Sequence, residues 1–177
     1  MKQSAAWVIQ AGSDLAAARR VLDEQDDSTF CQALANYQQV VEKSVKAMVA
    51  ALNESGVVQV TVSGNHTLEH EINGLDAVRR KKYGVDNASL EIIDRLFRRG
   101  RADIMLLCTL APKLPKPGAA YPRNTEYPFT DDSEEGWTAP AAPNTFSLEE
   151  VNRAARLAWP LYHSASRFAS SLRRRQR

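Results

Sequence analysis

Apolar residues recur every three or four positions along residues 29–52, where the chain has its most informative helical pattern. The apolar stripe consists of Phe30, Leu34, Tyr37, Val41, Val45, Met48 and Leu52. A polar cluster accompanies it, formed by Gln38, Gln39, Glu42, Lys43 and Lys46. Because so long an apolar stripe has to be covered by other helices, the segment predicts an all-α helical bundle.

Three further helices are predicted before a long irregular stretch. They cover residues 4–24, residues 66–83 and residues 87–107, and Gly100 is expected to weaken the third. Gly56 stands where a helix C-cap glycine belongs. The β-branched residues 57–62 after it predict a short extended segment rather than a helix.

The last helix has the clearest start signal of the chain. Ser147 and Glu150 form a capping-box pattern, and Phe146 with Val151 matches a hydrophobic staple. Pro160 interrupts the apolar stripe that follows and predicts a kink or a split there. Seven of the eight prolines precede this helix, so residues 112–146 are predicted to form a long loop.

Composition limits the classes of protein without choosing among them. A chain of 177 residues suits one domain over residues 1–177, and 23 basic against 21 acidic residues leave little bulk charge. Arginines gather within residues 95–101 and again within residues 167–177, which include a basic tail at 173–177. Such runs suit either phosphate contacts or a solvated helix face and a frayed tail.

The remaining composition indicates a location. Cys31 and Cys108 lie in apolar helical patterns and are expected to be buried free thiols. The chain has no signal-peptide pattern and no apolar run of membrane-span length. We therefore expect a cytoplasmic protein that does not enter a membrane, and no cofactor is indicated.

Five short patterns follow one another in an order that resembles HEPN domains, which are small helical bundles linked to nucleotides and RNA. They are Trp7 with Asp14-Leu15, the Gln38-Gln39-x-x-Glu42-Lys43-x-x-Lys46 run, His66-x-Leu68, Tyr-Pro pairs at Tyr121-Pro122-Arg123 and Tyr127-Pro128, and an alanine-rich final helix. The resemblance spans roughly residues 6–167. It implies an antiparallel up-and-down bundle of four to five helices, often dimeric, with the valine-rich segment and the proline-rich loop as insertions.

The resemblance also implies a type of function. HEPN-like modules bind nucleotide or RNA, or a partner protein such as a nucleotidyltransferase, and are often met in toxin–antitoxin and defence systems. Ribonuclease members use an arginine and a histidine separated by four to six residues, and Arg156 and His163 have this spacing. Histidine transfers protons near neutral pH and arginine holds phosphate, so this pair suits metal-independent RNA cleavage.

Other residues suit phosphate or base contacts. Lys43 and Lys46 are expected on the polar side of their helix, where they bind phosphate or form a solvated ion pair with Glu42. The aromatics Tyr121 and Tyr127 beside Arg123 suit a clamp on a base and its phosphate, or an anchor for the loop.

The segment from His66 to His70 matches an inverted zinc-protease motif. The motif lacks an evident third ligand, so a metal site is not predicted from it.

Three hypotheses follow from these patterns. The first is a binding module for nucleotide, RNA or a partner protein, with an antitoxin or a nucleotidyltransferase as the candidate partner. The second is a metal-independent endoribonuclease that uses Arg156 and His163. The third is a dimeric interaction scaffold without a ligand. The binding module is favoured because the arginine–histidine pair lies deep in the last helix, away from its N-terminal turns.

Overall fold

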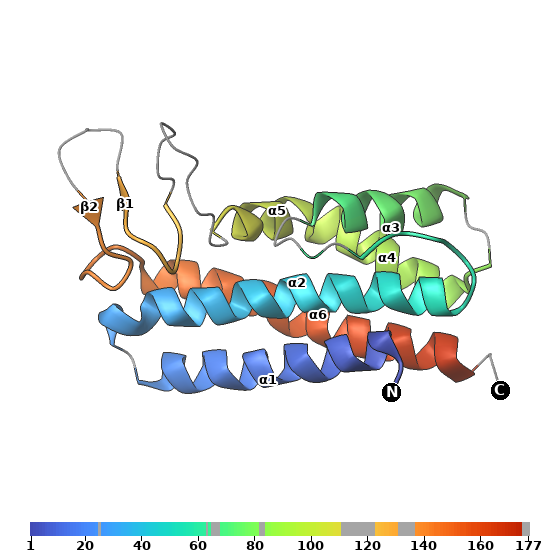
Figure 1. Cartoon of the computed structure of the whole chain (residues 1–177), viewed down its shortest axis with the longest axis horizontal. Coiled ribbons are helices and arrows are strands. Elements are labelled where there is room, and N and C mark those ends of the chain that lie inside the picture. Colours follow the sequence, from blue (N-terminus) through green and yellow to red (C-terminus); the bar gives the residue numbers. More distant parts are fainter. Residues whose placement is uncertain are drawn as a thin grey trace.

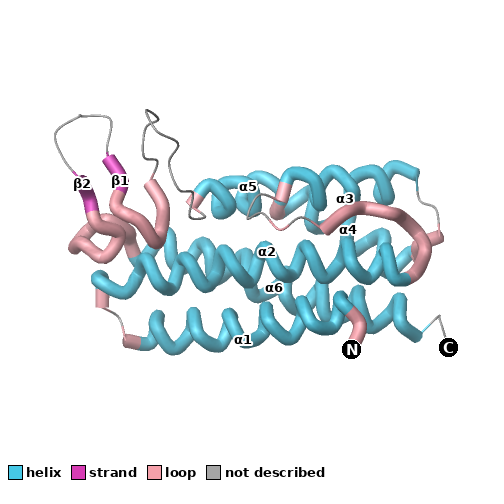
Figure 2. The backbone as a smooth tube through the Cα atoms, viewed as in Figure 1, coloured by secondary structure: helices cyan, strands magenta, loops and turns pink. Residues whose placement is uncertain are grey.

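The computed structural model describes residues 1–24, 26–62, 64, 68–81, 84–110, 123–130 and 137–174. The predicted all-α bundle is confirmed (Figure 1). Its helices are α1 (Gln3–Asp23), a 3₁₀ turn η1 (Asp27–Thr29), α2 (Phe30–Glu54), α3 (Glu69–Lys81), α4 (Asn87–Arg99), α5 (Arg101–Thr109) and α6 (Leu148–Arg174). Two strands of two residues each, β1 (Phe129–Thr130) and β2 (Trp137–Thr138), pair as a short antiparallel ladder (Figure 2).

Helix α2 forms the centre of the bundle and packs most extensively against α1 and α6. In Figure 1 it lies between α1 on one side and the α3, α4 and α5 layer on the other. Most of its residues are buried, including the polar Glu42 and Lys46, which lie outside the apolar stripe. The expectation that this pair would be solvated is therefore wrong, because other helices of the bundle cover it.

Helix α3 runs in the same direction as α2, because the connection between them turns back along the bundle. A Cβ atom at Gly84, just after α3, would lie 3.2 Å from Val57, just after α2, so both helices end at the same end of the bundle. Val60 faces the middle of α3, where a Cβ atom at Gly74 would lie 2.9 Å from its Cγ2 atom. The described residues 57–62 form no helix, as predicted, and they run beside α3.

Asn53 holds this connection in place. Its side-chain amide donates to the carbonyl of Val60 at 2.6 Å, and its Oδ1 accepts from the Val60 amide at 2.9 Å. The side chain therefore satisfies both backbone groups of Val60, as a neighbouring strand would do. Gly56, at φ 75°, gives the left-handed residue that ends α2, which confirms the predicted cap.

The predicted fourth helix is divided at Gly100 into α4 and α5. Counted as one interrupted helix, the pair gives the described part of the bundle five helices, within the four to five that were expected. The expected antiparallel up-and-down order is wrong for α3, because α3 runs parallel to α2. Asp86 caps α4 by accepting a hydrogen bond from the amide of Ser89 at 2.8 Å. Of the kink or split predicted at Pro160, the split is wrong, since α6 continues through that residue. Pro160 is solvent-exposed, so water can satisfy the carbonyl that the missing N–H leaves open.

The start of α6 is confirmed as a capping box. The Ser147 amide donates to Glu150 Oε2 at 2.8 Å, and the Glu150 amide donates to Ser147 Oγ at 3.2 Å. Phe146 and Val151 are both buried, as a staple requires. Part of the predicted loop 112–146 lies outside the described residues, and its described part carries the ladder between β1 and β2.

Candidate functional site

A groove of about 380 Å³ lies between α4, the start of α5 and the middle of α6. Its floor is apolar and its rim carries two arginines. The lining residues are Ile92, Arg95, Leu96, Gly100, Ile104, Arg156, Leu157, Pro160, Leu161 and Ser164. Leu96, Ile104 and Leu161 belong to the hydrophobic core, so the groove is held by rigid helices.

Arg156 is the more available of the two rim arginines. It is solvent-exposed, and within the described part of the chain its guanidinium makes no hydrogen bond and no ion pair. Arg95 is paired with Glu91 at 2.7 Å, one helical turn away on α4, but both side chains are more than half exposed. Exposed pairs of this kind contribute about 0.3–0.5 kcal/mol, so Arg95 can exchange its partner for an anion at small cost.

His163 does not line the groove. It is exposed on α6, where its ring lies 4.3 Å from that of Trp159 and 5.1 Å from that of Tyr162, both in edge-to-face geometry. No hydrogen bond links His163 to Arg156 among the described contacts, although both lie on the exposed side of the same helix. The structure therefore places the predicted catalytic pair on one surface without joining its two members, and their catalytic role stays a prediction.

The two lysines of α2 differ from the sequence prediction. Lys46 is 1% exposed, and its Nζ atom lies 2.7 Å from Glu42 Oε1, while the amide of Gln38 donates to Glu42 Oε2 at 3.2 Å. The Glu42–Lys46 pair thus exists, but inside the bundle rather than in solvent, because α1 brings the Trp7 ring to within 5.5 Å of the Lys46 ammonium. Phosphate binding by Lys46 requires this buried pair to open.

Lys43 is partly buried and joins α2 to α1. Its Nζ atom donates to Asp14 Oδ2 and to Gln39 Oε1, each at 2.6 Å. The predicted phosphate-binding role of Lys43 competes with these two acceptors. Its described contacts are those of a residue that fixes the α1–α2 packing.

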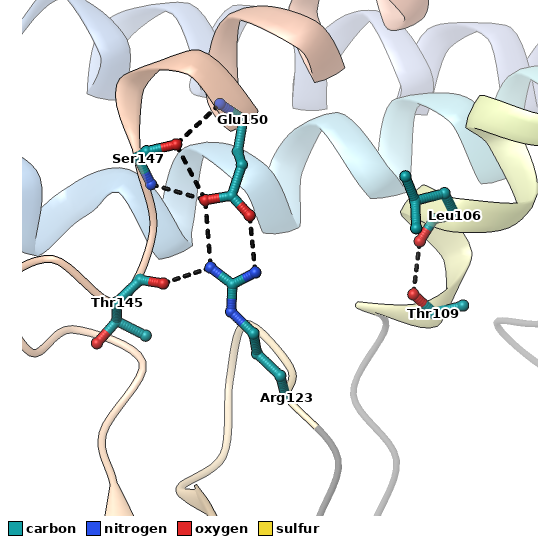
Figure 3. Close-up of polar contacts among 6 residues, drawn as sticks. All are labelled: Leu106, Thr109, Arg123, Thr145, Ser147 and Glu150. Atoms are coloured by element: carbon teal, nitrogen blue, oxygen red, sulfur yellow. Dashed lines mark hydrogen bonds and ion pairs between the residues drawn. The ribbon is translucent and has the colours of Figure 1, made fainter. Parts of the chain in front are cut away.

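Arg123 clamps the loop onto the start of α6 (Figure 3). Its guanidinium faces the Glu150 carboxylate with N–O distances of 2.7 and 3.2 Å, donates to the carbonyl of Thr145, and lies 4.2 Å from the centroid of the Phe146 ring. Burial by itself raises the pKa of Glu150, but hydrogen bonds from Arg123 and Ser147 outweigh that effect and hold the pKa below its ordinary value. Of the two alternatives for Arg123, these contacts match the loop anchor.

Of the two tyrosines predicted beside Arg123, the structure describes Tyr127, whose ring does not contact the Arg123 guanidinium. Tyr127 is 39% exposed, and its backbone amide donates to Asn124 Oδ1 at 2.6 Å within a tight turn. Tyr121 lies outside the described residues, as does His66 of the zinc-protease-like motif. His70 is exposed on α3. No group of three His, Cys, Asp or Glu side chains able to share a metal ion occurs among the residues that the structure describes.

Sequence reasoning also missed a contact between α1 and α6. The Arg19 guanidinium of α1 lies 3.7 Å from the centroid of the Trp159 ring on α6. Trp159 falls outside the apolar stripe of α6. A large aromatic residue on the polar side of an amphipathic helix could have indicated a contact of that side with another part of the protein. Its partner could not have been predicted, because the two residues are far apart in the chain.

Comparisons with known proteins give no relative for this chain. No protein-family model, no curated protein and no solved structure matches it. None of the helices in the described part of the chain combines the length and apolar character needed to cross a bilayer.

Proposed function

We propose that this chain is a nucleotide- or RNA-binding module, and that the groove between α4, α5 and α6 is its binding surface. The proposal is carried by one observation at the rim of this apolar groove. Arg156 is exposed there with no acidic partner among the described residues, and the opposite rim carries Arg95. An apolar floor suits the flat face of a base, and guanidinium groups at the rim suit phosphate oxygens.

The sequence resemblance to HEPN domains supports the same class of ligand. The helical bundle agrees with that resemblance but is common to many unrelated proteins, so the groove carries more of the argument than the fold does. A homodimer, an antitoxin or nucleotidyltransferase partner and a cytoplasmic location stay predictions of the sequence.

A direct test is the binding of a fluorescent 12-nucleotide single-stranded RNA, followed by anisotropy at low salt. Arg156→Ala and Arg95→Ala are each expected to weaken binding about 5- to 15-fold, the loss for a charge-assisted contact of about 1–1.5 kcal/mol. Arg20→Ala is the matched control, because Arg20 is an exposed arginine on α1 that does not line the groove.

The control decides how the result is understood. An equal loss of affinity in Arg20→Ala and Arg156→Ala would show that binding follows net charge rather than the groove. Absence of binding by the wild-type protein at low salt, to RNA and to a mononucleotide alike, would overturn the proposal.

The endoribonuclease alternative has one supporting observation, the exposure of Arg156 and His163 on the same side of α6. It predicts cleavage of a mixed RNA in EDTA by wild-type protein and its loss in both Arg156→Ala and His163→Ala. If binding is lost in Arg156→Ala and no cleavage is seen for wild type, the chain acts as a binding module only.

A further inference from the structure

The arginine–tryptophan contact between α1 and α6 lies outside the groove and is not used by it. Trp159 is 39% exposed although tryptophan is among the residues that gain most from burial. Arg19 covers its ring at 3.7 Å, and His163 meets it edge-on at 4.3 Å. Three side chains from two helices thus build a cluster of aromatic and cationic groups, and the exposure of Trp159, Arg19 and His163 leaves it open to solvent.

Within the described residues the Arg19 guanidinium makes no hydrogen bond and no ion pair, and its central carbon lies 3.7 Å from the centroid of the Trp159 ring. Both side chains are solvent-exposed, so an aromatic ring and guanidinium N–H groups are open to a ligand side by side. Those are the features that accept a nucleobase face and a phosphate.

The surface formed by Trp159, Arg19 and His163 lies next to the groove. Trp159 follows Arg156 by three residues on α6, and side chains at this spacing are neighbours on a helix surface. Arg156 therefore stands between the groove on the α4 side and Arg19 on the α1 side. A chain of nucleotides that placed a phosphate at Arg156 would bring an adjacent base to Trp159.

We propose that Trp159, Arg19 and His163 form a base-stacking subsite beside the groove, and that the ligand of this surface is a single-stranded nucleic acid with an unpaired base stacked there. The inference rests on the function proposed above and names its ligand class. Bases within a duplex are already stacked and paired, so they cannot reach such a subsite without being extruded. A free mononucleotide is too short to occupy groove and subsite together.

The test compares a normal 12-nucleotide single-stranded RNA with an abasic strand of the same length and phosphate count. Wild-type protein is expected to bind the normal strand more tightly, by about 5- to 160-fold for each stacked base. Trp159→Ala is expected to reduce this preference to the share that a base on the apolar floor of the groove contributes, and Trp159→Phe to reduce it less, while binding of the abasic strand stays unchanged in both. DNA of the same sequence, duplex RNA and a mononucleotide complete the set of probes.

Each outcome supports or overturns the inference. A preference for the normal strand that is unchanged in Trp159→Ala overturns the stacking subsite and leaves the proposed function standing, provided Arg156→Ala still weakens binding. Equal binding of normal and abasic strands by wild type overturns both the subsite and the placement of a base on the groove floor. Tighter binding of duplex than of single strand overturns the ligand class. Failure to bind any probe overturns the proposed function and this inference together.

Two controls separate base stacking from a loss of stability and from a loss of dimerisation. The helical circular dichroism signal of Trp159→Ala is expected to match wild type at the temperature of the binding assay, although its melting temperature should be lower because more than half of the side chain is buried. If Trp159→Ala converts a dimer to a monomer in size-exclusion chromatography with light scattering, Trp159 belongs to an interface between copies, and the inference is wrong. Equal affinity for RNA and DNA would identify a general single-strand binder, and preference for RNA an RNA-binding protein.

Discussion

The buried ion pair at the centre of α2 gives the sharpest prediction about stability. The side chains of Lys46 and Glu42 are 2% and 6% exposed, and the atoms that join them are 2.7 Å apart. Replacing Lys46 by Met keeps much of the side-chain volume but leaves the Glu42 carboxylate without this cation inside the bundle. Loss of one partner from a buried pair costs about 3–5 kcal/mol, out of a total stability of about 5–15 kcal/mol for a domain of this kind.

We therefore expect Lys46→Met to lower the free energy of unfolding by about 3–5 kcal/mol in urea denaturation. A loss of 1 kcal/mol lowers the melting temperature of a chain of this size by about 2–4 °C, so the variant should melt roughly 6–20 °C lower. The double variant Glu42→Leu/Lys46→Met removes both charges and is expected to recover most of that loss. Recovery stays incomplete because Gln38 loses the acceptor that Glu42 provides.

Lys43→Met is the matched control on the same helix. Lys43 and its partner Asp14 are each 13% exposed, so water reaches Asp14 after the substitution and the expected cost is about 1 kcal/mol. If Lys46→Met costs no more than Lys43→Met, or if the double variant is as unstable as the single one, the argument from a desolvated ion pair is refuted.

Three other predictions concern the loop clamp, the connection after α2 and a buried thiol. The contact with Arg123 holds the folded pKa of Glu150 below the ordinary value of 4.5. The pair therefore stabilises the fold above about pH 4.5, and this contribution is lost as the pH falls through the folded pKa. Glu150→Gln should make the free energy of unfolding depend less on pH in this range. Gly74→Ala gains about 1 kcal/mol in helix propensity, but the new methyl group would clash with Val60 at a cost of about 1–3 kcal/mol. The variant should therefore lose up to about 2 kcal/mol of stability in a thermal melt, and a net stabilisation would contradict the packing described. Burial raises the pKa of the Cys31 thiol, so a thiol reagent should react with it at neutral pH only after denaturation, and fast reaction with folded protein would contradict its burial.

The local features of the fold could be predicted from the sequence because each depends on neighbours in the chain. The capping box at Ser147 and Glu150, the cap at Gly56 and the break at Gly100 all follow from residue type and position. For Pro160 the predicted split is wrong, since α6 continues through it, while the predicted kink stays a prediction. A proline on the exposed side of a helix leaves its unpaired carbonyl to water, and exposure is a tertiary property.

The candidate site could be predicted only in part. Arg156 was identified by its spacing from His163, and the structure adds a reason of a different kind, the groove that it borders. The burial of Lys46 could not be predicted, because amphipathic spacing shows which residues share a side of a helix but not that α1 covers the polar side. The contacts from Arg123 to Glu150 and from Arg19 to Trp159 join distant segments, and no periodic pattern contains them.

The central claim is that Arg156 meets a phosphate of a bound nucleic acid. The most direct measurement is the dependence of single-stranded RNA affinity on salt, for wild type and Arg156→Ala. Each phosphate contact contributes about 0.7 to the slope of log affinity against log salt concentration for a single strand, so the variant should have a slope shallower by about 0.7. Parallel slopes for the two proteins would contradict the claim, because they would show that Arg156 does not meet a phosphate.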